Sequence, residues 1–307
     1  IRFIINIILL IISYLNILLW GVIISLLRSI LSGFFSGIGK TFIVMAASIV
    51  AMAANVGLDY ILIYGKLGFP AFGIEGAAYA TVAGGILGLM VLAVVYLRKK
   101  NRRRFGVRDS LHVDLDVAKK LLRFGSPAGV EMLLNLMAFN TLVLIFHSHS
   151  AATATAATIM FNWDMVSFVP LIGLEICVTS LVGRFMGAGE PQTAHKSTMA
   201  GLKIGVIYSV IVSFIFVCFP WYLVEVFRPD NSGLLFNNSV SLAVFMVRLA
   251  SLYVLVEAML IVFIGALRGA GDTFWAMGIS VSLHWGMVGV LYFIMRVFGL
   301  SPAVGWS

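Results

Sequence analysis

The sequence predicts an all-helical, polytopic membrane protein with two pseudo-symmetric lobes of six helices each, of which about eight helices lie in this chain. Two observations carry this prediction, the composition and an internal repeat. Apolar residues make up 61% of the 307 residues and charged residues only 11%, against about 25% charged residues in soluble domains. So few charges cannot cover a soluble surface, which excludes soluble enzymes, disordered chains and disulfide scaffolds. Cys177 and Cys218 lie far apart in apolar runs, where we expect small apolar fillers rather than a redox pair.

Eight segments have the length and apolarity of membrane spans, which need about 20 mostly apolar residues. They cover residues 3–27, 42–64, 75–97, 121–146, 153–183, 199–221, 239–267 and 273–297. The first segment lacks an initiator methionine and the layout of a signal peptide. We therefore expect it to be an internal helix of a longer protein.

A basic stretch separates the third and fourth spans. Ten of the 21 lysines and arginines fall between Arg98 and Arg123. Short basic loops of membrane proteins lie in the cytoplasm, so we expect a cytoplasmic linker at 98–120. The linker would divide the last three helices of the N-terminal lobe (1–97) from a C-terminal lobe that lacks its last helix (121–307). Docking on anionic membrane lipids is a possible added role, whereas nucleic acid is not expected as a partner, because Phe105 is the only aromatic residue there.

One short segment occurs twice, once near each end of the chain. The segment GFFSGIGKTFIVM at Gly33–Met45 returns 232 residues later as GALRGAGDTFWAM at Gly265–Met277. Six spans fit into this offset, so both copies have the same orientation and the lobes are parallel repeats. A phosphate-binding loop is excluded, because Phe34 stands where that motif needs a glycine and no strand precedes it. The glycines are instead expected to form a tight turn between two spans.

Several segments together resemble the multidrug and toxic compound extrusion (MATE) transporters. They are SGIGKT, LDYILIYGKLGFPAFGIEGAAYATV, FGSPAGVEMLL, TSLVGRFMGAGEPQTA and GALRGAGDT, which follow the family's order over nearly the whole chain. The resemblance implies the MATE fold in a bacterial-type inner membrane. It also implies a monomer that exports amphiphilic or cationic small molecules by antiport with Na⁺ or H⁺, with no cofactor. Asp59 departs from the family's usual asparagine, and Asn135 stands where many members have a glutamate.

Two other functions compete with export. Flippases of lipid-linked saccharides or lipid II share the broad architecture, but they generally need several cationic residues for the pyrophosphate, whereas the charges within these spans are mainly acidic. A membrane-embedded enzyme is disfavoured, because the spans contain no HExxH motif, no GxSxG motif and no histidine cluster.

Acids within spans are the candidate coupling residues, because a charge at mid-bilayer costs roughly 2.5–3.5 kcal/mol on insertion scales and is rarely without a role. The candidate set is Glu257, Glu131, Asp164, Asn135, Asn162 and Glu175. Glu257 precedes Arg268 by eleven residues, the spacing that the resemblance implies for a cation-binding acid. Glu257 and Glu131 are therefore the expected Na⁺ ligands.

Helix-interrupting residues mark candidate hinges. Pro127 lies near the start of the fourth span, and Pro170 and Gly173 lie within the fifth. Each proline removes one backbone hydrogen bond and permits a bend. A static kink is the alternative interpretation.

Overall fold

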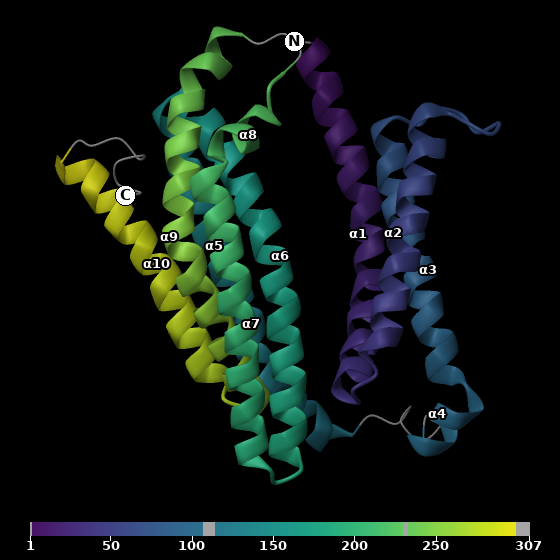
Figure 1. Ribbon diagram of the computed structural model, residues 1–307. Coiled ribbons are helices and arrows are strands. Elements are labelled where there is room, and N and C mark those ends of the chain that lie inside the picture. Colours follow the sequence, from purple (N-terminus) through teal and green to yellow (C-terminus); the bar gives the residue numbers. More distant parts are fainter. Residues whose placement is uncertain (1, 107–113, 230–232, 299–307) are drawn as a thin grey trace. The chain divides into compact units, whose positions relative to one another are not determined.

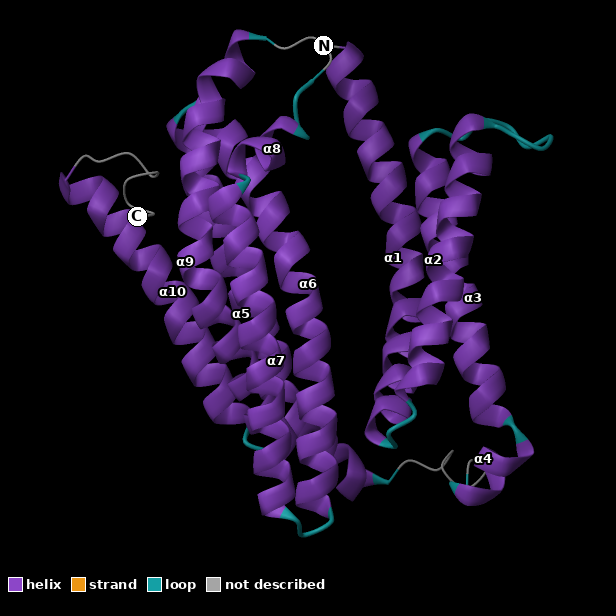
Figure 2. Ribbon diagram, viewed as in Figure 1, coloured by secondary structure: helices purple, strands orange, loops and turns teal. Residues whose placement is uncertain are grey.

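The computed structural model describes residues 2–106, 114–229 and 233–298, and these residues form helices and short connections without a strand (Figure 2). The helices are α1 (Arg2–Gly37), α2 (Thr41–Tyr64), α3 (Ile74–Leu97), α4 (Lys99–Arg104), α5 (Leu115–His149), α6 (Ala151–Gly187), α7 (Pro191–Cys218), α8 (Pro220–Glu225), α9 (Leu234–Ala270) and α10 (Thr273–Phe298). All but α4 and α8 contain a stretch long and apolar enough to cross a membrane, which makes eight candidate spans in the described residues. The predicted all-helical, eight-span architecture is confirmed.

The chain divides into two compact units, Ile1–Val113 with helices α1 to α4 and Asp114–Ser307 with helices α5 to α10 (Figure 1). The basic stretch at 98–120, expected as a linker, contains the short helix α4 and the first turns of α5. Its residues 107–113 lie outside the described part of the chain. Residues 299–307 of the expected C-terminal lobe also lie outside it.

In the first unit, small residues bring α2 and α3 close together. A Cβ atom on Gly84 would lie 2.7 Å from the carbonyl oxygen of Ala51, and one on Gly76 would lie 2.7 Å from that of Leu62. Helices within membranes associate through such small residues, because lipid provides no hydrophobic drive between them. The glycines of α3 therefore set the helix spacing in this unit.

In the second unit, α9 packs on α6 through Gly265 and Gly269, which are spaced as in a GxxxG motif. A Cβ atom on Gly269 would lie 2.7 Å from the carbonyl oxygen of Thr179. The Thr179 hydroxyl also donates to the carbonyl of Gly265, with 3.0 Å between the oxygens. Because the two backbones approach closely here, the neighbouring charged side chains Glu175 of α6 and Arg268 of α9 can reach each other.

The two copies of the repeat fold into the same turn, as predicted. Gly39 has φ 74° and Gly271 has φ 88°, the left-handed region that favours glycine. The amide of Gly39 donates to the Ser36 carbonyl, and the amide of Gly271 donates to the Arg268 carbonyl, at 3.0 and 3.1 Å. The amides of the next residues, Lys40 and Asp272, donate to the carbonyls of Phe35 and Leu267 at 2.8 Å in both copies.

The helices extend beyond the apolar segments from which they were predicted. The Asp114 side chain caps α5 by accepting from the amides of Asp116 and Val117, so this helix begins before residue 121. Two basic residues that follow directly on the apolar segments 3–27 and 239–267 also lie within helices. Arg28 lies more than two turns before the end of α1, and Arg268 lies in the last turn of α9.

Candidate functional site

The acids predicted from the second unit lie in two separate polar clusters along α9. The first cluster joins α6 to α9. The Tyr253 hydroxyl donates to Oδ1 of Asp164, with 2.6 Å between the oxygens. Glu257 follows one turn after Tyr253 on α9, and its Oε2 is buried without a hydrogen-bond partner among the described residues. Asp164 of α6 and Glu257 of α9 thus lie on two facing helices, and Tyr253 is hydrogen-bonded to the first and one turn from the second.

The second cluster is a partly buried ion triad built around Arg268 of α9. Nη2 of Arg268 lies 2.9 Å from Oε2 of Glu131 on α5, and Nη1 contacts Oε1 of Glu175 on α6. The Glu131 side chain is only 2% exposed. One guanidinium faces two carboxylates, so the triad carries one net negative charge when all three groups are ionised.

The structure therefore divides the predicted set. Glu257 and Asp164 belong to the first cluster, whereas Glu131 and Glu175 belong to the triad. Eleven residues of helix separate Glu257 from Arg268, which is about 16 Å along the axis. The two expected Na⁺ ligands thus have different neighbours, because Glu131 contacts Arg268 whereas Glu257 lies one turn from Tyr253.

The two predicted amides lie in different environments. Asn135 of α5 donates through Nδ2 to the Ser280 hydroxyl of α10 at 2.7 Å, and its Oδ1 is buried without a partner in the described residues. Asn162 is exposed and donates to the Thr158 carbonyl of its own helix at 2.7 Å. Asn162 precedes Asp164 by two residues and lies on a different face of α6, because residues two apart on a helix do not face each other.

The predicted hinge residues lie within intact helices, Pro127 in α5 and Pro170 in α6. The Tyr208 hydroxyl of α7 donates to the Ser167 carbonyl, three residues before Pro170, at 3.0 Å. This bond supports the backbone where the proline weakens the helix. A Cβ atom on Gly173 would contact nothing within 4 Å, so close packing does not require glycine there.

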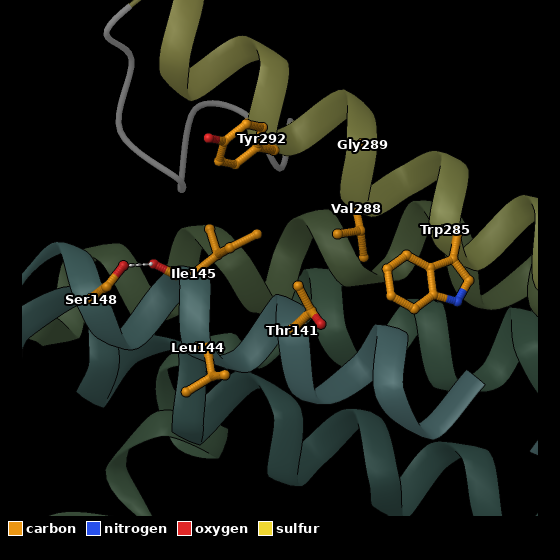
Figure 3. A pocket seen from close by; sticks show the side chains of 8 residues that line it. All are labelled: Thr141, Leu144, Ile145, Ser148, Trp285, Val288, Gly289 and Tyr292. Carbon is orange, nitrogen blue, oxygen red and sulfur yellow. Dashed lines mark hydrogen bonds between the residues drawn. The ribbon is translucent and has the colours of Figure 1, made fainter. Parts of the chain in front are cut away.

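An open groove of about 550 Å³ lies between α5 and α10 in the second unit (Figure 3). Its lining residues are Thr141, Leu144, Ile145, Ser148, Trp285, Val288, Gly289 and Tyr292. The indole Nε1 of Trp285 donates to the Leu134 carbonyl at 3.1 Å, which holds α10 on α5. Mostly apolar walls, three hydroxyls and two aromatic rings suit an amphiphilic molecule.

Four of these partners were not among the site residues predicted from the sequence: Tyr253, Arg268, Ser280 and Trp285. A polar cluster in the first unit was not predicted either. Nδ2 of Asn55 donates to the Thr81 hydroxyl at 3.4 Å, and Asp59, one turn after Asn55 on α2, has a buried Oδ1 without a partner among the described residues. A carboxylate with an amide at the i, i+4 spacing is the signal that could have revealed this cluster.

No described residues form a group of three or more histidine, cysteine or acidic side chains placed to hold a metal ion. The Asp164–Tyr253–Glu257 cluster offers two carboxylates and a phenol oxygen, which are oxygen ligands of the kind that hard cations prefer. The unpartnered Oε2 of Glu257 fits a site that takes up a small cation or a proton.

Curated relatives match along almost the whole chain. A probable multidrug resistance protein NorM of Thermotoga maritima is 28% identical over 96% of this chain and 62% of its own length. The same description applies to a Pasteurella multocida protein, 28% identical over 96% of this chain and 63% of its own length. The chain thus spans somewhat less than two thirds of these relatives.

Solved structures share the fold. A MOP superfamily transporter from Pyrococcus furiosus has a TM-score of 0.81 at 22% identity, over 96% of this chain and 64% of its own. Outward-facing and inward-facing structures of MATE transporters of the MOP superfamily have TM-scores of 0.82 and 0.67, at 22% and 20% identity. They cover 96% and 97% of this chain, and 64% and 66% of their own chains. The family model named MatE matches residues 127–291, which is more than half of the chain, and the protein therefore belongs to the MatE family.

Proposed function

We propose that this integral membrane protein exports amphiphilic or cationic small molecules in exchange for Na⁺ or H⁺. Its family, and the curated relatives described as multidrug resistance proteins, support small-molecule transport rather than catalysis. The observation that carries the coupling proposal is the Asp164–Tyr253–Glu257 cluster within two membrane spans. We place the protein, as a monomer, in a bacterial-type inner membrane with its 98–120 segment in the cytoplasm.

Electrostatics gives the cluster its proposed role. Two carboxylates in a low-dielectric site repel each other, and a bound cation or proton removes much of that cost. Tyr253 holds Asp164 by donating a hydrogen bond, which leaves the Glu257 oxygen as the group that gains a ligand. A cation drives transport only if it binds the outward-facing and inward-facing states with different affinity. We propose that Glu257 and Asp164 provide this difference.

The Arg268 triad has another role in this proposal. It ties α5, α6 and α9 together through one guanidinium, and we assign it to holding the helices rather than to coupling. The same pairing argues against a flippase that uses this arginine for pyrophosphate, because both of its outer nitrogens already face carboxylates.

We propose that substrate binding and helix bending involve other parts of the second unit. We propose that an amphiphilic cation binds in the α5/α10 groove, where the Trp285 and Tyr292 rings can face its charge. We propose Pro127, Pro170 and Gly173 as the points at which α5 and α6 bend. The helices α1 to α3 would correspond to the last three helices of an N-terminal lobe, and the second unit to most of a C-terminal lobe.

Replacing Glu257 by glutamine tests the coupling. The intact protein is reconstituted into vesicles, and ethidium movement is followed after a Na⁺ or a proton gradient is imposed. The Glu257→Gln variant keeps the shape of the side chain and removes its charge, so we expect it to insert normally and to lose gradient-driven export by at least about 100-fold, the scale on which a charge-pair loss of 3 kcal/mol acts.

The matched control is Glu190→Gln, an identical change at an exposed position in the α6/α7 turn, which should transport like the wild type. Wild-type export by Glu257→Gln would refute the coupling assignment. Export by the wild type that needs ATP and ignores both gradients would refute antiport itself. Comparing the two gradients identifies the coupling ion.

A further inference from the structure

The short helix α4 presents an unusual set of side chains at the end of α3. Its sequence is KKNRRR, with no acidic residue. All five of its bases are exposed, whereas the asparagine among them is only 4% exposed. An exposed run of bases is ordinarily a solvated loop, and what distinguishes this one is that the structure holds it in a fixed place.

The amide group of Asn101 anchors α4 to the bundle of the first unit. Its Nδ2 donates to the Val95 carbonyl at 2.7 Å, and this carbonyl belongs to the last turn of α3, where the helix supplies no partner. Its Oδ1 accepts from Nζ of Lys40 at 3.2 Å. One buried side chain thereby links α4 to the end of α3 and to the turn between α1 and α2.

An aromatic cluster provides a second anchor. Phe105, the residue after α4, packs edge-on against Phe34 of α1, with 5.1 Å between ring centroids, and Phe34 packs in the same way against Tyr96 of α3. The Arg104 guanidinium lies 5.4 Å from the centroid of Phe105. The Phe105 ring is therefore engaged within the protein and is not free to stack on a nucleic-acid base.

We propose that α4 is a docking surface for anionic phospholipid headgroups. The surface consists of Lys99, Lys100, Arg102, Arg103 and Arg104, held beside the end of a membrane span by Asn101 and Phe105. Leu97, the last residue of that span, is 59% exposed, so apolar surface adjoins the cations, as a lipid with an acyl chain and a charged headgroup requires. The proposal goes beyond transport and does not depend on the identity of the cargo or of the coupling ion.

Charge complementarity favours anionic lipid headgroups over uncharged ones as the occupant of this surface. Each lysine or arginine near an anionic membrane contributes about 1 kcal/mol, which is about five-fold in a binding constant. The start of α5 offers the matched comparison, because Lys119, Lys120 and Arg123 are also exposed but share that region with Asp114 and Asp116. The two sites thus differ in whether acids neutralise the bases.

The test measures lipid occupancy beside α4 in the intact protein. A bimane fluorophore is attached at Leu97→Cys in a background with Cys177 and Cys218 replaced by alanine, and the protein is reconstituted into phosphatidylcholine bilayers. Brominated phosphatidylglycerol or brominated phosphatidylcholine is then titrated as a quencher. We expect half-maximal quenching at an at least ten-fold lower fraction of phosphatidylglycerol, and the loss of this preference in 1 M salt, where charges are screened within about 3 Å.

Two triple variants isolate the surface. Lys99→Gln/Lys100→Gln/Arg103→Gln should abolish the preference, whereas Lys119→Gln/Lys120→Gln/Arg123→Gln, which removes the same residue types and the same charge, should keep it. Asn101→Ala, which leaves every base in place, should reduce the preference several-fold because it releases the anchor. No preference in the wild type, equal losses in both triple variants, or an unchanged preference in Asn101→Ala would overturn the proposal. So would co-purifying nucleic acid that only the α4 triple variant loses.

Discussion

At the scale of single residues, the second unit is organised by which carboxylate has a cationic partner. Arg268 neutralises charge next to Glu131 and Glu175, whereas Asp164 accepts a hydrogen bond from Tyr253 and neither Asp164 nor Glu257 makes an ion pair among the described residues. Asp164 and Glu175, eleven residues apart on α6, therefore lie in different electrostatic environments about 16 Å apart along the helix axis. Stability is expected to depend on the triad, and ion binding on the other pair.

Removing the arginine tests the structural role of the triad. In Arg268→Met both glutamates lose their partner and Glu131 stays buried, and breaking a buried ion pair costs about 3–5 kcal/mol. We expect a clearly lower unfolding temperature of the variant in detergent. The triple variant Arg268→Met/Glu131→Gln/Glu175→Gln removes the stranded charges as well and should recover most of the loss. An Arg268→Met variant that melts like the wild type would contradict the assignment.

The sequence revealed the acids of these clusters but not their grouping. A carboxylate within an apolar span is conspicuous by composition alone, and all four predicted acids lie in spanning helices. Pairing depends on the rotation of each helix and on which helices touch, which periodicity does not determine. Arg268 lies one residue beyond the span expected at 239–267, and without that arginine Glu131 had no visible partner.

At the scale of helices, the close contact of α6 and α9 depends on glycine. The Cβ of Gly269→Ala would meet the Thr179 carbonyl oxygen at 2.7 Å, and backbone cannot move aside as a flexible side chain can. Overpacking of this kind costs about 1–3 kcal/mol, so we expect a lower unfolding temperature. Gly278→Ala in α10 is the control, because its Cβ would contact nothing within 4 Å and alanine favours helix by about 1 kcal/mol. Equal melting of the two variants would argue against this view of the interface.

Helix ends were harder to predict than helix cores. Hydropathy identifies the part of a helix that lipid surrounds, whereas the ends are fixed by polar groups. The Asp114 cap moves the start of α5 to Leu115, and the left-handed Gly271 ends α9. The repeated glycine turn was predictable because its two copies are visible in the sequence, and both adopt the same backbone conformation.

At the scale of the whole molecule, the described residues of the two units show where polar groups enter each of them. Cys177 and Cys218 are free and exposed, on surfaces where large apolar side chains such as Trp20 and Phe214 are also exposed. Exposed apolar surface on this scale is expected of helices that face lipid. The polar clusters lie instead where helices meet within a unit, because polar groups need partners in a membrane.

Orientation in the membrane follows from the distribution of basic residues and can be tested by labelling. Asn101 of α4 is buried and hydrogen-bonded, so a cysteine there would react poorly with a labelling reagent. The exposed Lys100 next to it is the better position for a labelled cysteine. In a background with Cys177 and Cys218 replaced by alanine, Lys100→Cys should resist a membrane-impermeant maleimide in intact cells and react in inside-out vesicles, because basic loops remain in the cytoplasm. Lys66→Cys, exposed in the connection at the other end of α3, should show the opposite pattern, since one span separates the two positions. The reverse result for the pair would invert the orientation, and labelling of both from one side would show that α3 does not cross the membrane.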